Sequence, residues 1–150
     1  MAIVLDASVT ACWAFDDEDH PDASLAFDRM RAEEGVVPGL WWFEVRNILV
    51  VNERRRRIAE SGTARFLLHL SRLRIRVDRV PDEGAVLRLA RTHRLSVYDA
   101  AYLELAQRED LPLATLDTDL RKAAADEGVA LVSGGRPGSI SLGPSKEAPD

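Results

Sequence analysis

The amino-acid sequence predicts an α/β protein built on one mostly parallel sheet, with helices on both faces. Short apolar runs typical of buried strands recur along the chain, and segments with helical spacing of apolar residues separate them. Strands that alternate with helices in this way indicate βα units, whose strands run parallel. A chain of 150 residues is the length of one domain and can bury about 68–70% of the surface that its unfolded form exposes.

Five segments have the character of strands. Residues 2–5 form a wholly apolar run, and Val36-Val37-Pro38 is a short apolar segment ahead of Gly39. In residues 75–80, apolar and charged side chains alternate, which is typical of an edge or half-exposed strand. Two further apolar segments, residues 113–116 and 129–132, lie near the C-terminal end. We therefore predict a central sheet of five strands.

Helical spacing and helix-start residues define the segments between these strands. Ser8 is a candidate cap for a short first helix, Pro21 suits the first position of a second, and Ser61-Gly62 is a candidate break between a third and a fourth. The long third helix should turn Ile48 and Val51 inward. The helices are predicted after Ser8, from Pro21 to Gly35, over residues 40–57, through the apolar residues between Phe66 and Leu73, and over residues 82–93, 97–109 and 118–127. Residues 1–132 form the predicted domain, and residues 133–150, rich in Gly, Ser and Pro, a flexible tail.

Composition excludes several classes of protein. Hydrophobic residues make up 46% and charged residues 30% of the chain, values typical of a globular protein and not of a disordered one. The single cysteine, Cys12, fits a reducing compartment and is expected to be a small buried hydrophobe. No signal peptide and no apolar run of about 20 residues is evident, so we expect a cytoplasmic protein without a membrane span.

Charge is strongly segregated behind the net value of −5. Residues 16–34 hold eight acids and two arginines, whereas residues 54–79 hold nine arginines and two acids. The basic sector, which includes the run Arg54-Arg55-Arg56-Arg57, could attract a phosphate backbone, or it could be a solvated face closing a helix.

Four acids occupy unusual settings. Asp6 ends the first strand, Glu44 interrupts a bulky apolar segment, Asp99 opens a helix, and Asp117 ends the fourth strand. Each has an ordinary explanation: a turn for Asp6, an ion pair for Glu44, a capping box with Ser96 for Asp99, and a helix cap for Asp117. Asp119, in the first turn of a helix, is a weaker candidate. The pattern, more than any one position, indicates a site at the carboxyl edge of the sheet.

Such a cluster would need a cation. Like charges at about 5 Å cost about 3 kcal/mol per pair at an effective dielectric near 20, so a divalent ion or protonation must relieve them. Oxygen ligands alone favour Mg²⁺ or Mn²⁺ over zinc, and His20, His69 and His93 show no ligand spacing, which favours surface or capping roles. Ser8, Asn47 and Thr115 could support the ligands.

Four blocks carry a family resemblance. They are Val4-Leu5-Asp6-Ala7-Ser8, Phe43-Glu44-Val45-Arg46-Asn47, the segment of residues 95–103 around Asp99, and Ala114-Thr115-Leu116-Asp117. In this order they resemble PIN domains, especially the VapC-type toxin ribonucleases of prokaryotic toxin–antitoxin pairs. The resemblance extends over about residues 2–132. The arginine run, which lies between two of the blocks, and the tail are not part of the matching pattern.

The resemblance implies that Asp6, Glu44, Asp99 and Asp117 coordinate Mg²⁺ or Mn²⁺ and activate water for RNA cleavage. It assigns support of the site to Ser8, Asn47 and Thr115, and an additional acid to Asp119. It also implies a homodimer that blocks translation by cutting tRNA or ribosomal RNA. A VapB-type antitoxin would inhibit it through an apolar groove, for which the candidates are Trp13, Phe15, Trp41 and Trp42, although core packing is the more ordinary explanation of each.

Two other functions stay open. One is a phosphoryl-transfer enzyme with Asp6 as nucleophile, although Ser8 stands where a second acid would be expected. The other is a non-catalytic binding module that keeps the fold as a platform for a partner.

Overall fold

In the computed structural model, which describes residues 1–133, strands and helices alternate as predicted. The strands are β1 (Ala2–Leu5), β2 (Glu34–Pro38), β3 (Ile75–Asp78) and β4 (Leu113–Ala114). The helices are α1 (Ala7–Cys12), α2 (Pro21–Arg29), α3 (Leu40–Arg54), α4 (Glu60–Leu70), α5 (Glu83–His93), α6 (Val97–Glu109) and α7 (Thr118–Asp126).

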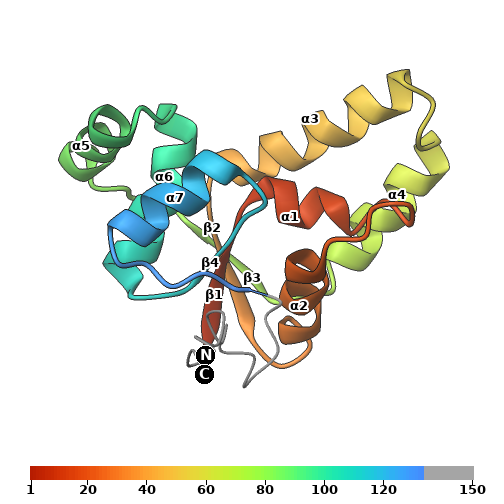
Figure 1. Cartoon of the computed structure of the whole chain (residues 1–150). Coiled ribbons are helices and arrows are strands. Elements are labelled where there is room, and N and C mark those ends of the chain that lie inside the picture. Colours follow the sequence, from red (N-terminus) through yellow and green to blue (C-terminus); the bar gives the residue numbers. More distant parts are fainter. Residues whose placement is uncertain (134–150) are drawn as a thin grey trace, which may run out of the picture.

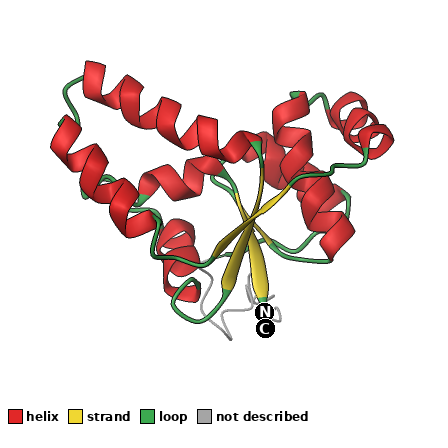
Figure 2. Cartoon of the chain, turned by 180° about the vertical axis from the view of Figure 1, so that it is seen from behind, coloured by secondary structure: helices red, strands yellow, loops and turns green. Residues whose placement is uncertain are grey.

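The strands form one sheet in the order β3-β2-β1-β4, and all neighbours are parallel. Helices α1, α2 and α4 lie on one side of it and α5, α6 and α7 on the other, while α3 starts near the carboxyl edge and extends outward (Figures 1 and 2). The predicted fold class is therefore confirmed. None of the helices described in residues 1–133 is long and apolar enough to cross a bilayer.

The predicted fifth strand is reduced to one bridge. Within the described residues, segment 129–132 pairs with the sheet only where Leu131 forms a parallel bridge with Leu113. The fourth strand is also shorter than predicted, because the N–H of Leu116 bonds the Ser8 hydroxyl and not a neighbouring strand (3.2 Å). The sheet thus has four strands in the described part of the chain. The predicted tail lies outside the described residues, apart from Ser133.

The break between α3 and α4 falls at residues 55–59 and not at Ser61-Gly62, which belong to α4. Arg56 adopts a left-handed conformation (φ 58°) that ends α3, and Arg57 turns back to donate to Asn52 (2.9 Å) and Glu18 (3.1 Å). Gly62 packs closely against Ile58: a Cβ atom added to Gly62 would lie 2.9 Å from the Ile58 Cγ1 atom, too close for an ordinary contact. The break is therefore set by long-range contacts, which local sequence does not encode.

The buried face of α3 also differs from the predicted one. Trp41, Val45 and Leu49 are buried, whereas Ile48 and Val51 are only partly covered. The predicted pair (i, i+3) and the observed set (i, i+4, i+8) both have helical spacing, so the error lies in the rotation of the helix about its axis.

The core is centred on β1, whose Ile3, Val4 and Leu5 are fully buried between β2 and β4. Gly35 on β2 allows the close contact on one side, because a Cβ atom there would lie 2.7 Å from the Leu5 Cδ1 atom. A strand buried by neighbours on both edges and helices on both faces holds the residue that follows it, Asp6, in a fixed place.

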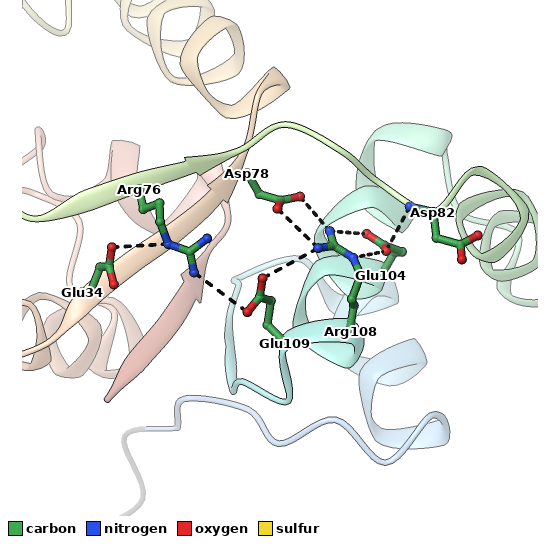
Figure 3. Close-up of polar contacts among 7 residues, drawn as sticks. All are labelled: Glu34, Arg76, Asp78, Asp82, Glu104, Arg108 and Glu109. Carbon is green, nitrogen blue, oxygen red and sulfur yellow. Dashed lines mark hydrogen bonds and ion pairs between the residues drawn. The ribbon is translucent and has the colours of Figure 1, made fainter.

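A network of charged residues fixes α6 against β3 and the start of α5 (Figure 3). Arg108 donates to Glu104 (2.6 Å) and to Asp78 at the end of β3 (2.7 Å). The buried Glu104 also accepts the backbone N–H of Asp82 (3.2 Å), the residue that caps α5. The charge of Glu104 is thus compensated, and α6 is held at its C-terminal half.

Candidate active site

The site lies where the chain changes direction across the sheet. From β1 the chain proceeds to β2 and β3 on one side, and β4 pairs with β1 on the other. In parallel sheets, ligands bind at the carboxyl ends of strands beside such a switch point. Asp6 follows β1, and Thr115 and Asp117 follow β4, so these three residues lie at the switch point.

Asp6 is the most buried of the candidate site acids, with 5% of its surface exposed. Its Oδ2 atom accepts hydrogen bonds from the hydroxyls of Thr115 (2.6 Å) and Ser8 (2.9 Å). Burial nevertheless raises the pKa of Asp6, because the loss of solvation outweighs these bonds. The carboxylate is therefore held at an energetic cost that a cation could relieve.

Ser8 and Thr115 connect the ends of β1 and β4. The Ser8 hydroxyl accepts the N–H of Leu116 (3.2 Å), and the Thr115 hydroxyl accepts the N–H of Asp117 (3.1 Å). Ser8 is not the cap of α1, because Asp6 occupies the cap position and Ser8 lies inside the helix. Each hydroxyl therefore accepts a hydrogen bond from a backbone N–H and donates one to Asp6. These bonds fix the position of the carboxylate.

Glu44 reaches the site from the first turns of α3. It accepts a hydrogen bond from the hydroxyl of Tyr102 on α6 (2.6 Å). Burial raises the pKa of Glu44, the bond from Tyr102 opposes this, and the charges of Asp6 and Asp99 raise it further. The charges of Asp6 and Asp99 therefore act on Glu44, so Glu44 lies within electrostatic range of both.

Asp99 lies in the first turn of α6. Its N–H bonds the hydroxyl of Ser96, the helix cap (3.0 Å), so the predicted capping interaction is present. Burial raises the pKa of Asp99, followed by the charges of Asp117 and Asp6. The Ser96 bond opposes the rise, and Asp119 adds a smaller repulsion. A capping role therefore does not account for the whole environment of this acid.

The remaining candidates lie at the edge of the site. Asp117 caps α7 by accepting the N–H of Leu120 (2.8 Å), as its ordinary explanation predicts, while its charge acts on Asp99. Asp119 is exposed in the first turn of the same helix. Asn47 is exposed on α3, one turn beyond Glu44.

Tyr102 is the contributor that sequence reasoning missed. Its ring is fully buried, and its hydroxyl reaches Glu44. Burial, followed by the bond to Glu44, raises the pKa of Tyr102, so the phenol stays protonated as a donor. The signal was present in its spacing, because a residue three positions after Asp99 faces the same side of α6.

The donor set fits a hard divalent cation. The acids offer carboxylate oxygens only, the ligands preferred by Mg²⁺ and Mn²⁺. In residues 1–133, however, no three of these acids have ligand atoms within 4.8 Å of one another; the one trio that does is Cys12, Glu18 and His20. Mg²⁺ usually takes few carboxylates and keeps several waters, so a wider arrangement of acids suits it.

Comparisons with known proteins identify the fold and the family. The fold is similar to the crystal structure of PAE2754 from Pyrobaculum aerophilum, with 26% identity, a TM-score of 0.65 and coverage of 88% of this chain and 92% of that one. It is also similar to VapC20 of Mycobacterium tuberculosis, a toxin that cleaves the sarcin–ricin loop, with 16% identity, a TM-score of 0.55 and coverage of 81% and 94%. No curated protein sequence matches the chain. The PIN domain family model matches residues 3–126, and the chain therefore belongs to the PIN domain family.

Proposed function

We propose that the protein is a Mg²⁺- or Mn²⁺-dependent endoribonuclease, which hydrolyses RNA phosphodiester bonds as the toxin of a type II toxin–antitoxin pair. The observation that carries this proposal is the set of acids from separate elements at the switch point of a PIN domain: the charges of Asp6 and Asp99 raise the pKa of Glu44, and the charge of Asp6 also raises the pKa of Asp99. The shared fold with VapC20, a toxin, supports the same reading.

In this proposal Asp6, Glu44, Asp99 and Asp117 hold the cation. When bound, the cation supplies positive charge that binds a phosphate oxygen and neutralises charge on the departing oxygen. The protein's own contribution is positional: Ser8 and Thr115 orient Asp6, and Tyr102 orients Glu44. Asp119 and Asn47 would act at the margin of the site.

The test is RNA cleavage by the purified chain with Mg²⁺, Mn²⁺ or EDTA, and mapping of the new RNA ends. Asp6→Asn and Asp99→Asn should abolish cleavage while thermal unfolding shows an intact fold. Asp126→Asn is the matched control, because Asp126 is an exposed acid on α7 away from the described contacts. Metal-dependent cleavage that persists in both site variants would overturn the assignment. Absence of both cleavage and Mn²⁺ binding in the unaltered chain would favour the non-catalytic module.

The RNA would also contact the arm formed by α3 and α4, which extends away from the sheet (Figure 1). Arg54, Arg55 and Arg56 are exposed at its tip and make no ion pair within the described residues, whereas Arg57 pairs with Asp17 and Glu18. Glu44 and Arg54 are ten residues apart on the helix, a distance of about 15 Å. A few nucleotides of RNA would span the distance between them. Replacing Arg54, Arg55 and Arg56 with Gln should weaken RNA binding and lower its dependence on salt.

The antitoxin proposal rests on a partly apolar hollow of about 530 Å³. Trp13 and Phe15, two of the predicted groove residues, line it together with Ile58 and Phe66. Trp41 is buried and donates its indole N–H to Thr10 (3.0 Å), so it belongs to the core, and Trp42 is exposed elsewhere on α3. A VapB-type segment would fill the hollow.

We propose further that the toxin is a homodimer and acts in the cytoplasm, on tRNA or ribosomal RNA. Expression of the chain alone should arrest bacterial growth, and light scattering should give twice the chain mass. Co-expression with a cognate antitoxin should restore growth, and Phe66→Asp in the hollow should prevent that rescue.

A further inference from the structure

A second group of metal-binding side chains lies outside the acidic site. The Cys12 Sγ atom, a carboxylate oxygen of Glu18 and a ring nitrogen of His20 all lie within 4.8 Å of one another. Cys12 is the last residue of α1, Glu18 lies in the connection to α2, and His20 directly precedes α2. The connection therefore folds back so that three different kinds of ligand meet.

Cys12 packs in the buried core and Glu18 pairs with Arg57, but neither contact involves His20. His20 occupies the cap position of α2, but its side chain makes no cap hydrogen bond; it is exposed, in agreement with the surface role predicted as the alternative. The buried thiol of Cys12 contacts Glu18; burial, followed by this acid, raises the pKa of Cys12 to about 11. Glu18 pairs with Arg57 (3.1 Å), and Arg57 also reaches Asp17. Arg57 therefore keeps a partner if Glu18 turns away.

We propose that Cys12, Glu18 and His20 form a Zn²⁺ site. Sulfur, imidazole nitrogen and carboxylate oxygen are the three ligand types of protein zinc, and sites with three protein ligands leave the fourth position to water or another group. A thiolate is a poor ligand for Mg²⁺, so this site selects a different metal from the acidic site.

The geometry needs only a small adjustment. Zinc bonds of 2.0–2.3 Å in a tetrahedron place neighbouring ligand atoms about 3.4–3.6 Å apart. Starting from separations within 4.8 Å, the exposed His20 and the half-exposed Glu18 can close the gap by side-chain rotation. Cys12 loses its thiol proton to the solvent as the Zn–S bond forms. The raised pKa of Cys12 makes this proton release a cost of binding.

Bound zinc would cross-link the end of α1 to the start of α2. The linked connection includes Trp13, Phe15, Asp16 and Asp17, which line the hollow described above. Zinc would therefore stiffen one wall of that hollow. Its ligand Cys12 lies 6 residues along the chain from Asp6, at the other end of α1.

The test is titration of the reduced full chain with one equivalent of Co²⁺ or Zn²⁺, in excess Mg²⁺ that occupies the acidic site. Co²⁺ should give the near-ultraviolet absorption of a sulfur–cobalt bond. Because Cys12 is the one cysteine in the sequence, the band reports this site alone. Zn²⁺ should abolish the band, protect Cys12 from a thiol reagent and raise the melting temperature.

Variants separate the ligands from the rest of the molecule. Cys12→Ala should lose the band, and His20→Gln and Glu18→Gln should each weaken Zn²⁺ binding at least about tenfold, since even indirect partners of a metal ligand are worth that much. His69→Gln, which changes an exposed histidine on α4, is the matched control and should bind as the unaltered chain does.

Two results would overturn the proposal: no sulfur–cobalt band in the folded, reduced chain, or a band with equal affinity in His20→Gln and Glu18→Gln. The second result would mean that the thiol binds metal without its neighbours. The outcome is independent of nuclease activity, because Asp99→Asn should retain the band.

Discussion

Replacing Asp99 with Asn should stabilise the metal-free protein while abolishing its activity. Asp99 is half-buried, and burial and the charges of Asp117 and Asp6 raise its pKa. A raised carboxyl pKa means that the folded protein holds the charged form at a cost, so the metal-free fold is less stable when Asp99 is ionised. Asn has nearly the same shape and carries no charge.

The size of the effect follows from opposing contributions. Two unit charges about 8 Å apart repel by about 2 kcal/mol at an effective dielectric near 20, and solvent at the half-buried Asp99 screens part of this. In the other direction, the N-terminus of α6 favours a negative charge by about 0.3–1 kcal/mol. The bond from the Asp99 N–H to Ser96 is retained in the variant. We expect a net gain of about 1 kcal/mol, and roughly 2–4 °C in melting temperature.

Urea and thermal unfolding in EDTA, at neutral pH, measure this gain. Adding Mn²⁺ should then reverse the order of stability, because a ligand present at 100 times its Kd stabilises the unaltered protein by about 2.7 kcal/mol. Asp126→Asn, the exposed control on α7, should change neither value by more than about 0.5 kcal/mol. The electrostatic reasoning fails if Asp99→Asn is less stable than the unaltered protein in EDTA, or if both respond equally to Mn²⁺.

Three further predictions concern the site and its support. Mn²⁺ affinity should fall with decreasing pH, and the fall should begin above pH 4, the ordinary carboxylate range, because carboxyl groups with raised pKa values take up protons at higher pH. Titration calorimetry across pH measures the midpoint of this fall, and a midpoint at the ordinary carboxylate pKa would refute this reasoning. Tyr102→Phe should move this loss to still higher pH, because Glu44 loses the hydrogen bond that lowers its pKa; the exposed Tyr98→Phe should not. Arg108→Ala should lower the free energy of unfolding by about 3 kcal/mol. Arg76→Ala is the control and should lower it by less than about 1 kcal/mol, because the ion pairs of Arg76 are half-exposed. Equal losses for the two variants in urea unfolding would contradict the argument.

Sequence predicted the fold and the central acids because both depend on local patterns. An apolar run that ends on Asp6 is enough to place an acid at the end of a buried strand, and parallel strands send such ends to one edge. Glu44 was recognisable because it breaks a bulky apolar segment. The Ser96 cap and the Asp117 cap follow from residue type and spacing alone.

Features that depend on contacts distant in sequence were not predictable. The end of α3 is set by Arg57, whose partners Asp17 and Glu18 lie about forty residues earlier. Tyr102, beside two alanines, looks like a core residue until Glu44 is placed against it. His20 has no ligand spacing of the usual kind, because a turn of the chain, and not a helix period, brings it to Cys12.

Asp6 keeps its carboxylate beside the most tightly packed part of the molecule, where a charge is costly. The strand before it is fully buried, so the main chain cannot move to carry the carboxylate toward solvent. Two hydroxyls and the start of α1 favour the charge, yet burial outweighs them and the pKa of Asp6 stays raised. Because relaxation is blocked, the charge of Asp6 continues to act on Glu44 and Asp99, and a bound cation would relieve it. The rigidity that fixes the acids would therefore also favour the cation binding that we propose.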